Sequence, residues 1–287
     1  MTQTKIEPEA KKDFSRWLVV SDIDGTLNNK LRRLPKRNLE AITHFVCDLG
    51  GHFTLASGRN VISLKKHFDR LPIASTPAIV MNGAGIYDFQ KDEMIWFRPI
   101  SARGEEITRL VLEKFPLVEA SVFTKDFIYL LHPRIFAPAQ MMADHLPHKR
   151  CAHFEQVPSG DWGKVIFYGL PHQMKQVARF IDSLENRQVN FIASSISTYE
   201  MLAEGVHKGT AVRVLSEMLG IPYDHTAAIG DYFNDFDMLK SVFLPAACGQ
   251  APKAVHAVAK FHACHCNRGA VGDFLEHICL LYTSDAA

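Results

Sequence analysis

Short apolar runs that alternate with amphipathic stretches constrain the fold of this 287-residue chain most strongly. Runs at residues 17–24, 51–56 and 78–81 have the length of buried strands, and helical patterns at 36–49 and 60–68 separate them. Strands that alternate with helices predict a parallel sheet with helices on both faces. We therefore expect an α/β fold built on a doubly wound parallel sheet, with ligands bound at the carboxyl ends of its strands.

The same alternation returns towards the C-terminus, after a long intervening segment. The expected elements there are helices at 210–219, 252–259 and 271–280, a further helix after Asp237, and strands at 226–229, 243–248 and 261–266. We assign both regions to one discontinuous core domain, residues 14–85 and 197–281.

Strands follow one another in pairs between about residues 85 and 197. The expected strands are 85–89, 94–98, 118–123, 127–132, 164–169, 190–194 and 198–202, with helices at 102–114, 138–146 and 172–186. Paired strands with intervening helices predict an α+β domain with an antiparallel sheet. We place this inserted domain at residues 86–196.

Two carboxylates, Asp22 and Asp24, end the first apolar run and are followed by Gly25. Alternate side chains of a strand point to opposite faces, so the loop has to turn both carboxylates towards one site, and glycine permits that turn. Neighbouring carboxylates need a counter-charge, which Mg²⁺ supplies with oxygen ligands. From this spacing alone, acids that cap the next helix or face solvent are an equal alternative.

Three further polar segments stand at strand ends or helix starts. Ser57 and Gly58 end the second strand, where a hydroxyl and free N–H groups can hold a phosphate oxygen, or the serine can simply cap a helix. Lys208 opens a helix and supplies a fixed positive charge, or is one of many solvated lysines. Asp231 and Asp235 follow another strand as metal-site acids, or as turn and cap residues.

In this order the segments resemble the four motifs of the haloacid dehalogenase (HAD) superfamily of phosphohydrolases. The motifs are DIDGT at 22–26, the Ser57–Gly58 turn, Lys208 and GDYFND at 230–235, within a resemblance that spans 17–276. The insert before Lys208, with EML at 200–202, resembles the Cof-like subclass IIB. The resemblance implies a Rossmann-like core and a cap domain that closes over small substrates.

The resemblance also implies roles for the acids. Asp22 is expected to be the nucleophile that forms an aspartyl-phosphate. Asp24 is expected to protonate the leaving oxygen and then to act as base for the hydrolytic water. Mg²⁺ is expected to be held by Asp22, the backbone carbonyl of Asp24 and Asp231. Asp235 is expected to orient Lys208 or a metal-bound water, and Asn234 to do likewise or to cap the following helix.

Substrate contacts are expected from a second group of residues. Ser57, Gly58 and Lys208 are predicted to hold the phosphate. Arg59 is predicted either to reach the phosphate or to cap the helix at 60–68 from outside. Asn82 resembles the asparagine that ends the third core strand of the subclass, and it is predicted either to touch substrate or to be a turn residue.

The predicted function is that of a Mg²⁺-dependent phosphatase for small organic phosphomonoesters such as sugar phosphates. A sugar phosphomutase is the near alternative, and it needs a second phosphate-binding cluster among cap residues such as Arg134, Lys149, Arg150 and Lys164. A non-catalytic phosphosugar-binding regulator is the more distant one. The intact motifs favour an enzyme, because binding alone needs no acid at Asp24.

Composition excludes several other classes of function. The 32 basic and 31 acidic side chains nearly balance, so no strong basic field favours nucleic acid or an anionic membrane. No apolar run approaches the ~20 residues of a membrane span, the N-terminal arm 1–13 is polar, and the six cysteines lack disulfide-framework spacing. We expect a cytoplasmic protein, a monomer or small homo-oligomer, whose partner is a small phosphorylated metabolite. The tail 282–287 resembles translated sequencing-adapter sequence and is treated as non-native.

Overall fold

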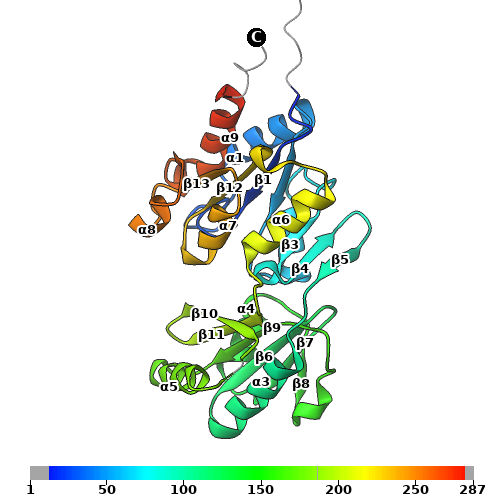
Figure 1. Cartoon of the computed structure of the whole chain (residues 1–287), viewed down its shortest axis with the longest axis vertical. Coiled ribbons are helices and arrows are strands. Elements are labelled where there is room, and N and C mark those ends of the chain that lie inside the picture. The colour runs from blue at the N-terminus through cyan, green and yellow to red at the C-terminus, as the bar shows by residue number, and fades with distance from the viewer. Residues whose placement is uncertain (1–12, 186, 282–287) are drawn as a thin grey trace, which may run out of the picture.

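The central sheet of the core has five strands, all parallel, as predicted (Figure 1). The computed structural model describes residues 13–185 and 187–281. From one edge to the other the strands are β14 (Phe261–His262), β13 (Leu244–Ala247), β12 (Thr226–Gly230), β1 (Leu18–Ser21) and β2 (His52–Leu55). The carboxyl ends of β1, β2 and β12 therefore meet at one edge of the sheet, which faces the inserted domain.

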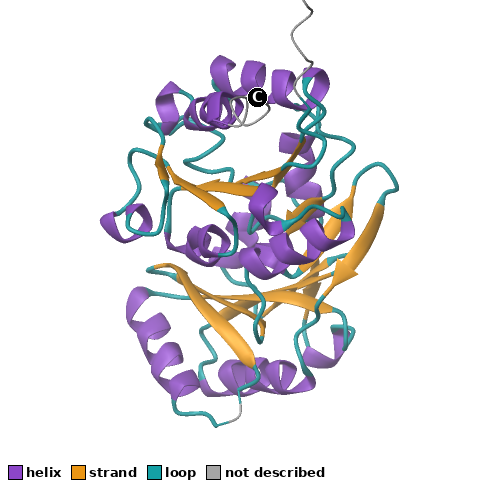
Figure 2. Cartoon of the chain, turned by 45° about the horizontal axis from the view of Figure 1, so that its top comes forward, coloured by secondary structure: helices purple, strands orange, loops and turns teal. Residues whose placement is uncertain are grey.

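Helices cover both faces of this sheet (Figure 2). Val19 of β1 packs in a cluster with residues of α1 (Lys36–Thr43) and α9 (Ala270–Leu281). Leu18 and Val20 point the other way, into a cluster with α6 (Lys208–Met218) and α7 (Phe236–Lys240). This alternation along one buried strand is what a doubly wound sheet requires.

The other core helices match the predicted positions and differ mainly in their ends. The helix expected at 36–49 is α1 followed by a π-helical turn, His44–Asp48. Asn60 caps α2 (Val61–Phe68) because its side chain accepts the Ser63 N–H at 2.9 Å. The remaining short helices and turns of the described chain are α8 (Lys253–His256), Met81–Gly83, Phe154–Gln156, Tyr223–His225, Phe233–Asp235 and Cys266–Arg268.

One hairpin joins a different sheet from the one expected. Strands β4 (Gly85–Asp88) and β5 (Glu93–Phe97) were predicted to belong to the insert, but they pair antiparallel with β3 (Ala78–Val80). β3 itself is bridged in parallel to the core sheet through Ala56 and Ile79. The hairpin therefore extends the core, and we propose that the first domain boundary lies after β5 instead of at residue 85.

The cap domain is built on a six-stranded sheet. Its order is β10 (Val189–Ser195), β11 (Thr198–Ala203), β9 (Trp162–Tyr168), β6 (Glu119–Thr124), β7 (Ile128–Leu131) and β8 (Lys149–Cys151). Because β11 belongs to this sheet, we propose that the second domain boundary lies after β11 instead of at residue 197. The predicted antiparallel pairing is confirmed except at β8, which runs parallel to β7. β8 was not predicted because two of its three residues are exposed basic side chains, which give no apolar signal.

Helices α3 (Ala102–Lys114) and α5 (Pro171–Asp182) pack on one face of the cap sheet, with Val111 and Val177 among the residues in contact. The opposite face of the cap sheet contributes Phe123 and Ile166 to the same apolar cluster as the core. The third cap helix, α4, spans Phe136–Ala143. The cap therefore turns this sheet face towards the core together with α4, whose Ala137 and Met141 belong to the same cluster.

Most of the predicted N-terminal arm and the whole tail at 282–287 lie outside the described residues. Within the described chain, no helix combines the length and the apolar character needed to cross a membrane.

Candidate active site

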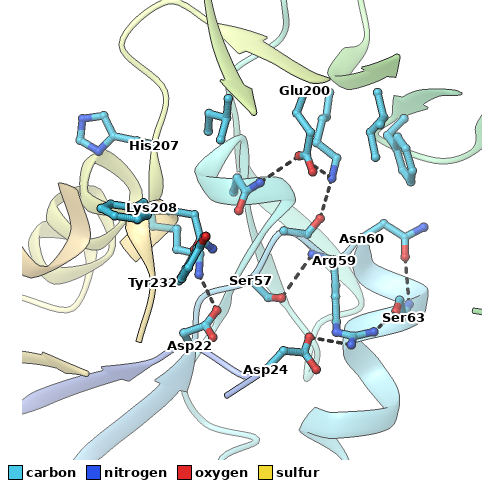
Figure 3. A pocket seen from close by; sticks show the side chains of 18 of the residues that line it. Asp22, Asp24, Ser57, Arg59, Asn60, Ser63, Glu200, His207, Lys208 and Tyr232 are labelled. Atoms are coloured by element: carbon cyan, nitrogen blue, oxygen red, sulfur yellow. Dashed lines mark hydrogen bonds and ion pairs between the residues drawn. The ribbon is translucent and has the colours of Figure 1, made fainter. Parts of the chain in front are cut away.

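A cavity of about 820 Å³ lies between the strand ends of the core and the core-facing side of the cap (Figure 3). Both domains line it. Its walls include Asp22, Asp24, Ser57, Gly58, Arg59, Asn82, Lys208, Asp231 and Asn234 from the core, and Phe123, Gln140, Asp144, Lys164, Ile166 and Glu200 from the cap. Of the predicted site residues, Asp235 alone does not line the cavity and lies behind it.

Lys208 binds two buried carboxylates at once. Its Nζ lies 2.5 Å from Asp22 Oδ1 and 2.6 Å from Asp235 Oδ1, and its side chain is 1% exposed. The lysine is placed there because α6 begins at this residue, where the ring of His207 accepts the Thr210 N–H. Burial acts to lower the pKa of Lys208, but Asp22 and Asp235 outweigh it and raise the pKa. The lysine therefore stays charged.

Burial raises the pKa values of the two acids at the strand ends, Asp22 and Asp231. Burial, assisted by the charge of Asp235, raises the pKa of Asp22 to about 7, although Lys208 opposes the rise. Burial likewise raises the pKa of Asp231 to about 6. Carboxylates with raised pKa values at one place are poised either to share a proton or to bind a cation.

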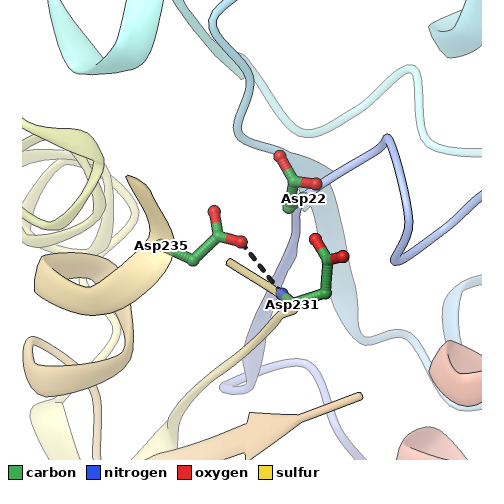
Figure 4. Close-up of side chains that lie close together, drawn as sticks. All are labelled: Asp22, Asp231 and Asp235. Carbon is green, nitrogen blue, oxygen red and sulfur yellow. Dashed lines mark hydrogen bonds between the residues drawn. The ribbon is translucent and has the colours of Figure 1, made fainter. Parts of the chain in front are cut away.

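Asp22, Asp231 and Asp235 each place a carboxylate oxygen within 4.8 Å of the other two (Figure 4). Both carboxylate oxygens of Asp235 already accept hydrogen bonds. Oδ1 accepts from Lys208, and Oδ2 accepts from the backbone N–H groups of Asp231 and Tyr232 at 3.0 and 3.3 Å. Asp22 and Asp231 remain as hard oxygen donors. The donor set therefore fits a divalent cation held by these two acids, with Asp235 as their support.

Two residues outside the motif acids position Asp231. Thr26 donates through Oγ1 to Asp231 Oδ1 at 3.4 Å. Gln250 donates through Nε2 to the Gly25 carbonyl at 2.5 Å and lies 3.4 Å from Asp231 Oδ2. Sequence reasoning missed Gln250, because it stands in the loop after β13 with no pattern around it.

Both the backbone conformation at residue 25 and the atoms around it require glycine there. Its φ is +88°, in the left-handed region, and a Cβ there would overlap the Asp231 carboxylate. We expect Gly25→Ala to displace Asp231 and to lower the free energy of unfolding by at least ~2 kcal/mol, since it combines backbone strain with a clash. Thermal unfolding would measure the loss, and the Mg²⁺ concentration for half-maximal activity should rise with it.

Gly160 supplies the matched control for that substitution. Its φ is +92°, yet no atom lies within 4 Å of its ideal Cβ position. Gly160→Ala therefore tests backbone strain without a clash, and we expect it to cost about 1 kcal/mol and to leave the Mg²⁺ requirement unchanged. Equal losses in the two variants would show that the contact with Asp231 is unimportant.

Arg59 neither caps α2 from outside nor projects free into the cavity. Its Nη2 donates to Asp24 Oδ2 at 2.7 Å and its Nη1 donates to Ser63 Oγ at 3.0 Å. The Asp24 side chain is 49% exposed, in contrast to Asp22. Arg59 Nε is buried and has no hydrogen-bond partner within the described chain. The pair therefore brings one acid and one incompletely bonded guanidinium to the cavity wall.

The turn after β2 is joined to Asn82. Ser57 Oγ accepts the Arg59 N–H at 3.3 Å, and the Ser57 carbonyl accepts the Asn82 N–H at 2.9 Å. Asn82 has a φ of +55°, and its Nδ2 donates to Glu200 of the cap at 3.0 Å. Asn82 is thus a turn residue that also contacts the cap. Asn234 lines the cavity and is half-buried.

Residues 19–275 match the model of the haloacid dehalogenase-like hydrolase family. The chain belongs to the haloacid dehalogenase-like hydrolases. This membership confirms the predicted superfamily and explains why the motif residues, far apart in sequence, meet at one edge of the HAD core.

Curated relatives of this HAD hydrolase are named phosphatases. The HMP-PP phosphatase of Enterobacter sp. (strain 638) is 26% identical over 272 residues, covering 91% of this chain and 94% of the relative. The 5-amino-6-(5-phospho-D-ribitylamino)uracil phosphatase of Bacillus subtilis is 24% identical, with 88% and 91% covered. These relatives agree with the predicted enzyme class, a phosphoric monoester hydrolase.

Solved structures confirm the fold of this HAD hydrolase. A haloacid dehalogenase-like hydrolase from Bacteroides thetaiotaomicron superposes with a TM-score of 0.80 at 20% identity, covering 91% of this chain and 99% of the other. A HAD subclass IIB sugar phosphatase gives a TM-score of 0.77 at 21% identity, with 92% and 100% covered. The core and cap arrangement of the Cof-like subclass IIB is therefore present in this chain.

Proposed function

We propose that this protein is a Mg²⁺-dependent phosphatase that hydrolyses small organic phosphomonoesters through an aspartyl-phosphate. One observation carries the proposal: the buried carboxylate of Asp22 ends β1 and borders a cavity of about 820 Å³ between core and cap, with its charge balanced by Lys208. That volume suits a small metabolite. Sugar phosphates, with the related phosphorylated metabolites, are the proposed substrate class.

Asp22 acts as the nucleophile. Its carboxylate oxygen attacks phosphorus, the bond from phosphorus to the leaving oxygen breaks, and an acyl-phosphate forms on Asp22. The attack needs the ionised form, and the ammonium of Lys208 at 2.5 Å favours that form against the burial that opposes it. Water then attacks the acyl-phosphate, releasing inorganic phosphate and restoring Asp22.

Asp24 moves the protons. It gives a proton to the leaving oxygen in the first step and takes one from the attacking water in the second. In the structure Asp24 is paired with Arg59 at the cavity wall. In the acid step Asp24 carries a proton, so Arg59 then turns from Asp24 to the substrate phosphate. The unpartnered Nε of Arg59 supports that assignment.

Ser57, Lys208 and the turn N–H groups around Gly58 hold the non-bridging oxygens. Asp22, Asp231 and the backbone carbonyl of Asp24 would hold Mg²⁺, with Asp235 and Asn234 as support. When bound, the ion neutralises charge that builds up on the transferred phosphoryl group.

The phosphomutase alternative gains no support from the cavity. Among its described lining residues Lys164 is the one cation that the cap contributes, and Lys164 is already paired with Glu200. Arg134, Lys149 and Arg150 are not among those lining residues. A second phosphate at the cap end would therefore face a neutral pair rather than a basic cluster.

Phosphate release from a panel of sugar phosphates, nucleotides and cofactor phosphates, with and without Mg²⁺, tests the proposal. Release that requires Mg²⁺ is the expected result. No release from any compound with the metal present would reject the phosphatase. A cytoplasmic location and a monomer or small homo-oligomer remain predictions for fractionation and light scattering.

Asp231→Asn tests the metal assignment. We expect the Mg²⁺ concentration for half-maximal activity to rise at least ~10-fold, because an amide is a weaker ligand for a hard cation than a carboxylate. EDTA should abolish activity in both proteins, and excess Mg²⁺ should restore the variant partly. An unchanged Mg²⁺ dependence in Asp231→Asn would remove this residue from the proposed ligands.

A further inference from the structure

A polar network joins the cap to the core at the cavity, and the motif roles given above do not include these contacts. Lys164 of β9 donates through Nζ to the Gly58 carbonyl at 2.9 Å and pairs with Glu200 of β11 at 3.1 Å. Glu200 accepts in turn from Asn82 Nδ2 at 3.0 Å. Figure 3 shows Glu200 on the cap side of the cavity, across from the turn that carries Ser57 and Arg59.

Both charges of this network are buried. The side chains of Lys164 and Glu200 are 4% and 11% exposed, and the ammonium also lies 4.9 Å from the centroid of the Phe123 ring. A buried ion pair is tolerated when each charge keeps its partners, and removing one partner leaves the other charge uncompensated. Displacing the cap sheet would separate Lys164 from Gly58 and Glu200 from Asn82.

The core segments held by this network form the phosphate side of the proposed site. The Gly58 carbonyl belongs to the turn that carries the Ser57 hydroxyl. Asn82 closes on the same turn through its N–H, and a Cβ at Gly58 would lie only 3.0 Å from the Asn82 amide atoms. The turn and Asn82 therefore behave as one packed unit. Since Nδ2 is bound to Glu200, the orientation of the Asn82 amide is also set by the cap.

We propose that Lys164 and Glu200 are positioning residues, through which the cap fixes the Ser57–Gly58 turn and Asn82 in the geometry that holds phosphate. The inference rests on the proposed phosphatase function, and it adds that the phosphate side of the site is complete only when the cap sheet lies against the core. Removing these residues should impair activity even when the fold is intact.

The decisive variant replaces both charges with apolar side chains. Glu200 lies between Ile166 and Ile192 on neighbouring strands, so leucine suits its place, and methionine matches the length of Lys164. Lys164→Met and Glu200→Leu alone each leave a buried charge unpaired and should lower Tm. The double variant should recover Tm, because an apolar pair can replace a buried ion pair without loss of stability.

With p-nitrophenyl phosphate as substrate, we expect the double variant to lose at least ~10-fold in kcat/KM despite its recovered Tm, since misplaced contacts impair phosphoryl transfer. The inhibition constant of inorganic phosphate should rise in parallel. Activity within threefold of wild type at recovered Tm would overturn the inference.

Glu105→Gln is the matched control. Glu105 is a buried cap carboxylate on α3, bound to Ser159 Oγ and the Gly160 N–H, away from the cavity. The Glu105→Gln substitution should lower Tm, and at a temperature where the variant is folded it should leave kcat/KM unchanged.

Hydrogen exchange makes the test independent of turnover. In Glu200→Gln the amides of Ser57 and Asn82 should exchange faster than in Glu105→Gln, and equal exchange would overturn the inference even if the double variant does not fold. A wild-type protein that releases no phosphate from any substrate would reject the proposed function instead, and the exchange result would still decide whether the network positions the turn.

Discussion

Asp22→Ala is expected to reduce Mg²⁺-dependent phosphate release by at least ~10³-fold, because no other described group takes its place as nucleophile. The fold should survive. Burial and the charge of Asp235 raise the pKa of Asp22, so the ionised Asp22 carboxylate destabilises the folded protein. In the variant Lys208 still has Asp235 as its ion-pair partner. Steady-state kinetics with thermal unfolding would measure both effects.

Asp88→Ala is the matched control for that experiment. Asp88 is also a buried aspartate, 8% exposed, but its carboxylate accepts the N–H groups of Gln90 and Lys91 in the turn after β4. The Asp88→Ala variant should have a lower free energy of unfolding than the wild type and an unchanged kcat. If Asp22→Ala retained most of its activity while it stayed folded, the covalent mechanism would be wrong.

Lys208→Met is expected to damage both stability and activity. It leaves the carboxylates of Asp22 and Asp235 buried without their shared cation, which should lower the free energy of unfolding by about 3–5 kcal/mol. The nucleophile would lose the charge that favours its ionised form, and the phosphate would lose a ligand, so kcat/KM should fall by at least ~10²-fold. Denaturant unfolding and steady-state kinetics measure the two losses separately.

A second substitution separates these two effects. Lys208→Met with Asp235→Asn removes one of the stranded charges, so part of the stability should return. Activity should not return, because the positive charge beside Asp22 is still missing. Recovery of activity together with stability would mean that Lys208 has a structural role only.

The core sheet could be predicted from the sequence because each of its strands is indicated by its own short run of residues. The runs that became β1 and β12 are mostly apolar, and β2 is buried at three of its four positions although it contains His52 and Thr54, as expected of strands covered on both faces. Motif acids follow β1 and β12, the Ser57–Gly58 turn follows β2, and parallel pairing alone brings these ends together. Asp22 and Asp231 could thus be placed near each other without any knowledge of side-chain geometry.

The parts that could not be predicted depend on contacts between distant residues. The hairpin of β4 and β5 looks like any other antiparallel pair, and only the bridge between Ala56 and Ile79 decides that it extends the core. The pair of Lys164 and Glu200 forms across two strands of the cap sheet, and nothing near either residue indicates its partner. The pairing of Arg59 with Asp24 likewise has no signal in the sequence, while a contact of Arg59 with phosphate stays a prediction.

The place of β1 in the sheet has a consequence for how the chain matures. β1 lies between β2, which follows it closely in sequence, and β12, which is made about 200 residues later. During synthesis β1, an inner strand of the core sheet, therefore keeps one edge unpaired while the whole cap is translated. An unpaired apolar strand edge is prone to aggregation and is a typical binding site for chaperones. The cap, being continuous in sequence, is free to fold first. β12 can reach β1 only after the cap has been made, and its arrival brings Asp231 and Lys208 to Asp22, so no nascent chain that ends before β12 has a complete site.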